Sequence, residues 1–479
     1  MKGIVALVSA FCLCLFCVSV EAAKLSPSAL EGINKSLSAK GMVSVLIEYE
    51  SPLTSAQPLS SLKGEARVTA LNTMRRSFLT SLTSSTAATV VRQYQYLPGL
   101  LSNVNADQLA ELRASKYVKA IYENKQRKAS LAQSVGIVYP AKAAAGLDGS
   151  QQMVAILDSG VDKNHSFFKT NGVTRVKSEA CYSGGNLTHF SEIDSLCPGN
   201  ATRSTASGSG EDCTGYIGCD HGTHVAGIAA GNGGVASGAN ILAIQVFTGI
   251  RDLFNNDLCK TGPGTNCISA FDSDIIAGLE RVFALRNTFN IAAVNMSLGF
   301  GRFGGSCNSE NNLVTNIIGQ LKSAGIATVV ASGNNGYSSD ISFPACISNA
   351  IAVGATSDFT GDIFGNPVTR DKRVFYSNTS SILDLYAPGT LINSSVPNGN
   401  FSNFNGTSMA TPHVAGAFAV IQQGDPSLSV AQIESTLKSV GPNVTAGGVT
   451  RRRLDIKGAL MKLGLFKVVT APILLLLDD

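Results

Sequence analysis

Three residues that lie far apart in the chain have the side chains that nucleophilic hydrolysis requires. Asp158 follows the apolar run 154–157, His221 stands in Asp220-His221-Gly222, and Ser408 stands in Gly406-Thr407-Ser408-Met409. A serine hydroxyl is a weak nucleophile at neutral pH, so it needs a base within hydrogen-bond reach and an acid that orients the base. The residue types therefore predict a nucleophile at Ser408, a general base at His221 and an orienting carboxylate at Asp158.

Each of these residues also has a structural interpretation. Ser408 could be the N-cap of the apolar helix predicted after it, and Asp158 could be a carboxylate in a turn at a strand end. His221 and His224 could bind a metal ion together. Zinc peptidases, however, place two histidines four residues apart with a glutamate after the first, and Gly222 stands at that place.

The residues that follow Ser408 predict where it lies on its helix. Pro412 lies within the apolar segment after Ser408. Because proline is tolerated only in the first turn of a helix, Ser408 should lie near the helix start. The free backbone N–H groups and the positive dipole end at that point favour an oxyanion.

The order Asp, His, Ser and the three surrounding motifs resemble the catalytic segments of the subtilisin-like (subtilase) serine proteases. This resemblance covers residues 134–460. It implies that Asp158, His221 and Ser408 are catalytic and that His224 is structural. It also implies that Asn334, rather than its neighbour Asn335, points a side-chain amide at the developing oxyanion, together with the backbone N–H of Ser408.

The same resemblance assigns a substrate-binding role to Ser297, Leu298 and Gly299, which would pair with the substrate backbone as an added strand. Gly299 and Gly333 would flank a slot for a large apolar side chain. We therefore predict a preference for Leu, Phe or Met before the scissile bond. Phe300 departs from the family, which usually has a small residue there, and could reshape the cleft.

Short apolar runs alternate with helical patterns through the middle of the chain. The runs lack polar alternation, which is typical of strands covered on both faces of a parallel sheet. The predicted fold class is therefore α/β, with a doubly wound, mostly parallel sheet of the subtilisin-like type and ligands at the carboxyl ends of its strands. Predicted strands are 154–157, 241–246, 291–296, 327–331 and 350–353, predicted helices are 223–230, 272–290 and 312–323, and the resemblance adds a closing strand at 452–456.

The N-terminal part of the chain predicts two further segments. Residues 1–23 are typical of a secretory signal peptide, with an N-terminal membrane anchor as the alternative. Residues 24–131 have a β-α-β-β-α-β pattern if 100–104 is a separate strand, a small α+β ferredoxin-like order, and resemble the inhibitory propeptide of subtilases. Cleavage after Leu131, or alternatively after Lys128, would leave a peptidase domain at 132–462 and a short C-terminal tail at 463–479.

The cysteines predict disulfide bonds. Of the eleven cysteines, three would leave with the signal peptide, and the remaining eight are an even number in an exported chain. A zinc site is the alternative, but no CxxC pair occurs among these eight cysteines. Proximity in sequence favours the pairs Cys181–Cys197, Cys213–Cys219, Cys259–Cys267 and Cys307–Cys346, among many connectivities that eight cysteines allow.

Charge and loop composition limit the partners. The net charge is +4 and the longest basic run is Arg451-Arg452-Arg453, so nucleic-acid binding is not predicted, and we expect this triplet to be a solvated strand end. We also expect no membrane partner and a monomer. No cofactor is required for the chemistry and no metal site is predicted. The loop 231–238, where secreted subtilisins usually bind calcium, is short and lacks a carboxylate, so structural calcium would have to bind elsewhere.

These observations predict a secreted, extracellular serine endopeptidase made as a self-processing zymogen. Its partners would be protein or peptide substrates and its own propeptide as an intramolecular inhibitor, and the triad would act through an acyl-enzyme. A catalytically silent binding protein on the same fold and a metal-dependent hydrolase are the alternatives. Inhibition by a serine-directed phosphonate, combined with resistance to chelators, would separate these three functions.

Overall fold

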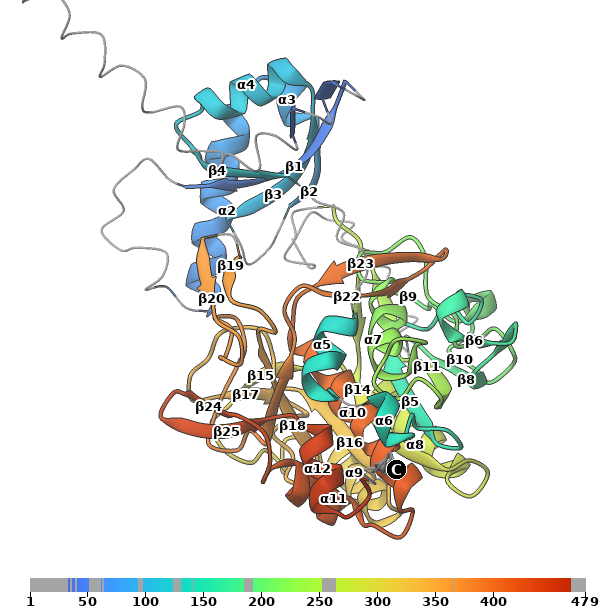
Figure 1. Ribbon diagram of the computed structural model, residues 1–479. Coiled ribbons are helices and arrows are strands. Elements are labelled where there is room, and N and C mark those ends of the chain that lie inside the picture. Colours follow the sequence, from blue (N-terminus) through green and yellow to red (C-terminus); the bar gives the residue numbers. More distant parts are fainter. Residues whose placement is uncertain are drawn as a thin grey trace, which may run out of the picture. The chain divides into compact units, whose positions relative to one another are not determined.

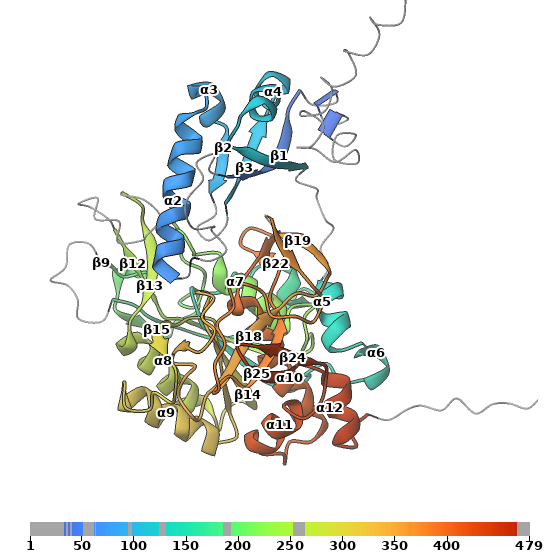
Figure 2. The ribbon, with the colours of Figure 1, turned by 90° about the vertical axis from the view of Figure 1, so that its left-hand side faces the viewer.

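The computed structural model describes residues 33–34, 37–38, 41–50, 62, 64–93, 98–123, 131–140, 142–184, 193–251, 264–363 and 365–466. Figures 1 and 2 show the ribbon from two sides. The chain divides into a unit formed by Met1–Arg127 with Asp362–Asn366 and a unit formed by Lys128–Gly361 with Pro367–Asp479. The predicted signal peptide and all but the start of the predicted tail lie outside the described residues. Within those residues, no helix is both long and apolar enough to cross a membrane.

The first unit has the predicted ferredoxin-like order of elements. Its sheet has the strand order β2-β3-β1-β4 with antiparallel neighbours. Alternate residues of the first strand, Val43, Val45 and Ile47, point into a buried core. The helices α2 and α4 contribute Phe78 and Leu112 to the same core. The elements are β1 (Val43–Tyr49), α2 (Gly64–Thr80), α3 (Ser84–Ala87), β2 (Val90–Gln93), β3 (Gly99–Val104), α4 (Ala106–Ala114) and β4 (Val118–Glu123).

The second unit is built on a ten-stranded sheet in the order β10-β8-β11-β5-β14-β16-β18-β21-β25-β24. Neighbours from β8 to β25 are parallel, and the edge strands β10 and β24 pair antiparallel. The mostly parallel sheet of the prediction is thus confirmed. The strands are β5 (Met153–Asp158), β8 (Val176–Tyr182), β10 (Arg203–Ser204), β11 (Asn240–Gln245), β14 (Ile291–Met296), β16 (Ala327–Ala331), β18 (Ile351–Thr356), β21 (Leu385–Pro388), β24 (Asn443–Ala446) and β25 (Val449–Arg453).

Helices cover both faces of this sheet. Figure 2 shows α8 (Asp272–Leu285) and α9 (Asn312–Ser323) on one side, and α10 (Thr407–Gly424) with α11 (Val430–Leu437) and α12 (Ile456–Lys462) on the other. The helix α7 (His221–Ala230) packs against α10 and β5. This two-sided cover explains why β5, β14 and β16 are buried along their whole length and therefore lack polar alternation.

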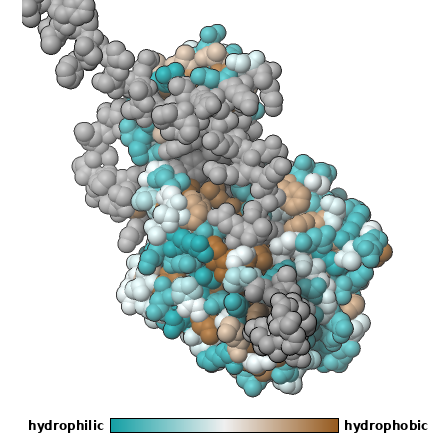
Figure 3. Space-filling view, viewed as in Figure 1, coloured by the Kyte–Doolittle hydropathy of each residue, from teal (hydrophilic) through white to brown (hydrophobic). Residues whose placement is uncertain are grey.

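Figure 3 shows that the coloured residues on one face of the molecule are mainly hydrophilic, with smaller hydrophobic areas between them.

Several smaller elements lie outside the two main sheets. Two short helices, α5 (Leu131–Val138) and α6 (Lys142–Ala145), precede the ten-stranded sheet. The hairpins and small sheets are formed by β6 (Lys169–Thr170), β7 (Val173–Thr174), β9 (Ile193–Asp194), β12 (Phe247–Ile250), β13 (Cys267–Ala270), β15 (Phe300–Phe303), β17 (Ile341–Phe343), β19 (Gly361–Ile363), β20 (Asn366–Val368), β22 (Ile392–Val396) and β23 (Asn400–Phe404).

The C-terminal edge of the sheet differs from the sequence prediction. The closing strand is Val449–Arg453, and the chain starts α12 at Ile456, so the predicted strand 452–456 is wrong in its second half. The triplet 451–453 is also not a solvated strand end. Arg453 is buried and its Nε lies 2.9 Å from Asp371 Oδ1, because a charge inside the protein needs a partner. Arg451 donates to the carbonyls of Leu383 and Ser381.

Three of the four predicted disulfides are present. The bonds Cys181–Cys197, Cys213–Cys219 and Cys307–Cys346 link residues 16, 6 and 39 positions apart. The fourth predicted pair includes Cys259, which lies outside the described residues, and its expected partner Cys267 is disulfide-bonded.

Candidate active site

Asp158 and His221 form a hydrogen-bonded pair at the carboxyl end of β5. Asp158 is the last residue of the strand and is fully buried, and its Oδ1 lies 2.7 Å from His221 Nδ1. The same oxygen accepts a 2.8 Å hydrogen bond from the backbone N–H of Ser159. A carboxylate that accepts from Nδ1–H fixes the imidazole tautomer and leaves Nε2 as the nitrogen that can take up a proton.

The helix that carries His221 begins directly against the turn after β5. The side chain of the N-cap residue, Asp220, makes no capping hydrogen bond to this helix. Instead, the backbone N–H of Gly222 donates to Ser159 Oγ at 2.8 Å. A Cβ at Gly222 would lie 2.1 Å from the carbonyl oxygen of Gly160, so only glycine allows this approach of helix and turn. The small residues of the histidine motif thus bring His221 to the strand end.

Ser408 is the second residue of α10, as predicted from its motif. Pro412, however, lies in the second turn and not in the first. Because Pro412 has no N–H, the carbonyl oxygen of Ser408 loses its helix partner, and Ser297 Oγ donates to it instead at 2.8 Å. The predicted reason for the helix start was therefore wrong, although the predicted position of Ser408 is confirmed. In this conformation the Ser408 hydroxyl donates to the carbonyl oxygen of Ser297 at 3.2 Å and not to His221.

Asn334 lies beside the start of α10 and is held there by Thr407. Its Oδ1 accepts from the Thr407 backbone N–H at 2.8 Å and from the Thr407 hydroxyl at 2.9 Å. The amide oxygen is therefore occupied, and Nδ2 is the end of the side chain that can donate elsewhere. A Cβ at Gly406 would lie 3.3 Å from Asn334 Nδ2 and 3.5 Å from the Ser408 backbone nitrogen. Asn334 Nδ2 and the Ser408 backbone N–H thus border the same space, the position that a Gly406 side chain would occupy (called here the space above Gly406).

The predicted substrate segment follows β14 at the same edge of the sheet. Ser297 is tied to Ser408 by two hydrogen bonds, and Leu298 and Gly299 continue toward β15. A Cβ at Gly299 would lie 3.3 Å from Ser342 Cβ, and one at Gly333 would lie 2.4 Å from Ser342 Oγ. A Cβ at Gly299 would also lie 2.9 Å from the Phe343 carbonyl oxygen, and one at Gly333 would lie 2.4 Å from Asn378 Nδ2, so other protein atoms fill the space beside both glycines.

Phe300, the departure from the family pattern, is 54% exposed. Its ring lies 5.5 Å from that of Phe343, centroid to centroid, in a T-shaped contact. β15 pairs with β17 so that Phe300 lies opposite Phe343 in the register. A large, half-exposed aromatic side chain therefore stands next to Gly299.

Three histidines of the second unit differ in their pKa because of their surroundings. Burial lowers the pKa of His221, but the charge and hydrogen bond of Asp158, with a further contribution from Asp220, raise it more, so the net pKa lies above the usual value. Burial lowers the pKa of His224 to about 3; its Nε2 lies 2.9 Å from the Ser402 carbonyl oxygen. Burial likewise lowers the pKa of His413 to about 4. Only His221 has a nearby carboxylate that stabilises its protonated form.

Some residues that position the site were missed by the sequence analysis. Asn378 is buried, and its Oδ1 accepts from the backbone N–H groups of Asn335 and Tyr337 at 3.0 and 3.1 Å. It thereby shapes the turn that presents Asn334. Asn295, also buried, donates to Ser297 Oγ at 3.0 Å. Both are polar residues in apolar or small-residue surroundings, which is the signal that could have identified them.

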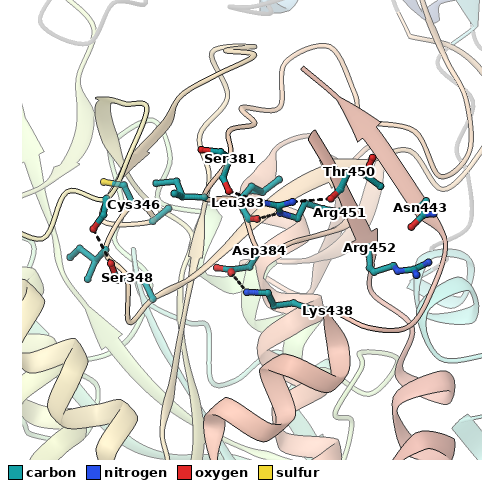
Figure 4. Close-up of a pocket in the computed structure, with 15 residues that line it drawn as sticks. Cys346, Ser348, Ser381, Leu383, Asp384, Lys438, Asn443, Thr450, Arg451 and Arg452 are labelled. Atoms are coloured by element: carbon teal, nitrogen blue, oxygen red, sulfur yellow. Dashed lines mark hydrogen bonds and ion pairs between the residues drawn. The ribbon is translucent and has the colours of Figure 1, made fainter. Parts of the chain in front are cut away.

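A cavity of the second unit lies away from these residues. It has a volume of about 480 Å³ and is bordered by the segment before β21, by β25 and by Cys346. Figure 4 shows that two of its cations are paired: Lys438 contacts Asp384, and Arg451 contacts main-chain carbonyls. The third cation, Arg452, donates to the carbonyl oxygen of Gly441 at 2.9 Å. Among the described residues, no group of three or more His, Cys, Asp or Glu side chains is arranged to hold a metal ion.

Comparison with known proteins agrees with this geometry. The family model described as "Subtilase family" matches residues 149–452. Subtilisin E of Bacillus subtilis (strain 168) is 31% identical over 364 residues, which cover 73% of this chain and 77% of the relative; subtilisin Savinase of Lederbergia lenta is 33% identical over 311 residues, which cover 64% and 88%. A solved protease of Pseudoalteromonas arctica PAMC 21717 aligns with a TM-score of 0.51 and 25% identity, over 70% of this chain and 96% of that one. The chain belongs to the subtilase family of serine endopeptidases.

Proposed function

We propose that Asp158, His221 and Ser408 are the catalytic triad of a secreted endopeptidase that matures by cutting its own chain. The observation that carries this proposal is the 2.7 Å hydrogen bond between the buried Asp158 carboxylate and His221 Nδ1. Ser408 is the second residue of α10, the helix that packs against α7. The carboxylate holds the imidazole so that Nε2 is free to accept the Ser408 proton.

The reaction would proceed in two halves. Rotation about the Ser408 Cα–Cβ bond releases its hydroxyl from the Ser297 carbonyl and turns it toward His221. The oxygen then attacks the peptide carbonyl, and His221 takes the proton and returns it to the leaving amine. A water molecule, activated by the same imidazole, releases the acyl group from Ser408.

The oxyanion of each tetrahedral intermediate would be bound in the space above Gly406. Asn334 Nδ2 and the Ser408 backbone N–H border that space, and the N-terminal end of α10 adds a positive dipole. The two bonds from Thr407 hold the amide oxygen in place, so the amino group needs no reorganisation when charge develops.

The substrate would lie against Ser297, Leu298 and Gly299 and would pair with them through its backbone. The apolar surface of Phe300 supports a preference for Leu, Phe or Met before the scissile bond. A panel of fluorogenic peptides tests this specificity, and a strong preference for Arg or Lys over Leu and Phe would contradict it.

The ferredoxin-like first unit is proposed to be the inhibitory propeptide, and the peptidase unit to start near residue 132. The disulfides of the second unit support export, since such bonds persist in oxidising compartments. We further propose that the mature protein is a monomer that needs no cofactor for the chemistry.

Substitution of the nucleophile tests the function and the maturation together. Ser408→Ala should abolish peptide hydrolysis and leave the precursor uncut, while circular dichroism and the melting temperature stay close to those of the wild type. Gel mobility and N-terminal sequencing of the product measure the processing and its site. Normal turnover by the folded, purified variant would disprove the triad.

A further inference from the structure

One disulfide lies directly beside the candidate catalytic residues. Cys213 and Cys219 enclose a short loop, and Cys219 is followed by Asp220 and His221. Both half-cystines are buried, with 7% of each exposed. The bond therefore closes the segment from which the histidine helix starts.

Both ends of this loop bind the same residue, Ser159. The backbone N–H of Cys213 donates to the Ser159 carbonyl oxygen at 3.1 Å. The Ser159 hydroxyl donates to the Cys219 carbonyl oxygen, also at 3.1 Å. The disulfide thus fixes the spacing between the two backbone groups that hold Ser159.

Ser159 in turn contacts both members of the acid–base pair. Its backbone N–H donates to Asp158 Oδ1, the oxygen that also bonds His221. Its hydroxyl accepts from the N–H of Gly222, at the start of the helix. Since the N-cap residue Asp220 makes no side-chain cap, Ser159 provides that hydrogen bond from outside the helix.

The segment just before the loop contacts the turn after Asp158 through backbone atoms. A Cβ at Gly160 would lie 2.0 Å from the carbonyl oxygen of Glu211, two residues before Cys213. A displacement of Cys213 that shifts this segment should therefore also move the turn, because close-packed backbone atoms transmit it.

We propose that the Cys213–Cys219 disulfide, acting through Ser159, is a positioning element that keeps Asp158 and the start of α7 in register for catalysis. The proposal rests on the proposed function of Asp158 and His221. Cys213, Cys219 and Ser159 are positioning residues and touch no substrate in this scheme. Their loss should lower the rate of the chemical step while the fold persists.

The test compares two variants that each lack one disulfide. The first is Cys213→Ser with Cys219→Ser, and the matched control is Cys181→Ser with Cys197→Ser. The control bond encloses a longer segment and, in the described residues, makes no hydrogen bond to Asp158, Ser159 or His221. Peptide hydrolysis is measured as kcat and KM, and unfolding is measured as the melting temperature.

The two variants should differ in kind. Misplacement of a catalytic group by about 1 Å costs on the order of 100-fold, so kcat of the first variant should fall by roughly 10- to 100-fold with KM within about twofold. The control should lose thermal stability and keep kcat within about twofold. Full kcat in the first variant, or equal losses of kcat in both, would overturn the proposal.

The pH profile gives a readout that a merely structural role would not change. Asp158 from β5 and Asp220 before α7 are the charged groups that raise the His221 pKa, while His224 and His413 remain neutral above about pH 5. If the first variant loosens the Asp158–His221 bond, the acid limb of kcat/KM should move to lower pH. An unchanged limb contradicts the proposal.

A third variant keeps the test informative if the disulfide-free protein fails to fold. Ser159→Ala retains both cystines and removes the two hydrogen bonds of the hydroxyl, so kcat should fall and the acid limb should shift in the same direction. When Ser159→Ala is combined with the first variant, kcat should fall little further, because both changes break the same connection from the disulfide through Ser159 to Asp158. Wild-type kcat in Ser159→Ala, or additive losses, would refute the role. Inactive Ser408→Ala together with fully active Cys213→Ser/Cys219→Ser would overturn this inference alone and leave the proposed function standing.

Discussion

Replacement of Asn334 by leucine should separate transition-state stabilisation from substrate binding. Leucine is near in size to asparagine and removes the Nδ2 donor that borders the space above Gly406. Loss of one oxyanion donor costs about 2.7–4 kcal/mol, so kcat should fall by roughly 10²–10³. Because the hydrogen bond forms mainly in the transition state, KM should change much less.

Two matched variants sharpen this experiment. Asn334→Asp preserves the shape and the acceptor for Thr407 but presents a second carboxylate oxygen to the oxyanion, so it should be at least as slow as the leucine variant. Asn335→Leu changes the neighbour, whose Oδ1 only accepts a long, 3.5 Å bond from Asn378, and kcat should stay within about threefold of wild type. Steady-state kinetics on one peptide substrate gives all three values.

The outcome that refutes the reasoning is equally specific. A kcat within about threefold of wild type in Asn334→Leu would remove this residue from the oxyanion site, since the smallest expected effect is about 100-fold. A larger loss in Asn335→Leu than in Asn334→Leu would assign the donor to the neighbour. Equal increases in KM and losses in kcat/KM would indicate that the amide binds substrate and transition state alike.

Three further outcomes follow from charges and buried groups. The midpoint of the acid limb in the pH profile of kcat/KM should lie above about pH 6.5, because Asp158 raises the His221 pKa and only the neutral imidazole accepts a proton. A midpoint below that pH would contradict the pairing of Asp158 with His221. Burial lowers the His413 pKa to about 4, so below about pH 6.5 the unfolded chain binds a proton that the folded chain does not, and the free energy of unfolding decreases. Between pH 7 and about pH 5 this free energy, measured by urea titration, should decrease by about 2 kcal/mol less in His413→Gln than in the wild type. An equal decrease in both proteins would refute this. Loop-closure entropy predicts that the Cys181–Cys197 bond, which closes the longer loop, contributes about 3 kcal/mol to stability and that Cys213–Cys219 contributes about 2 kcal/mol. The variant without Cys181–Cys197 should therefore melt at the lower temperature of the two. The reverse order would show that strain or packing dominates.

The sequence predicted the elements whose environment is uniform. Runs such as 291–296 and 327–331 are apolar throughout because both sheet faces are covered, and they coincide with β14 and β16. β8 was missed because its sequence, Val176–Tyr182, mixes a lysine and a glutamate with apolar residues near the edge of the sheet. Helix 272–290 was predicted too long, since α8 ends at Leu285.

At the candidate site, the sequence predicted the groups proposed to carry the chemistry and not the groups that hold them. Asp158, His221, Asn334 and Ser408 stand in local motifs. Polar positioning residues such as Asn378 are recognised only through partners 41 and 43 positions away, which no local pattern encodes. Pro412 was misread for the same reason, because the replacement donor for the Ser408 carbonyl comes from a different strand end.

The strand order has a consequence for the timing of activity. Asp158 ends β5, Ser297 follows β14 and Asn334 comes after β16, three neighbouring strands of the sheet. His221 and Ser408 lie at the starts of α7 and α10, and the contacts that join these residues span 63, 73 and 111 positions of the chain. Contacts of such long range form late in folding, since the entropy of closing large loops must be overcome first. A chain that has closed only part of its sheet therefore holds an isolated acid, base or hydroxyl and has no hydrolytic power. We therefore expect proteolytic activity only after β5, β14 and β16 have paired and α7 and α10 have packed against them.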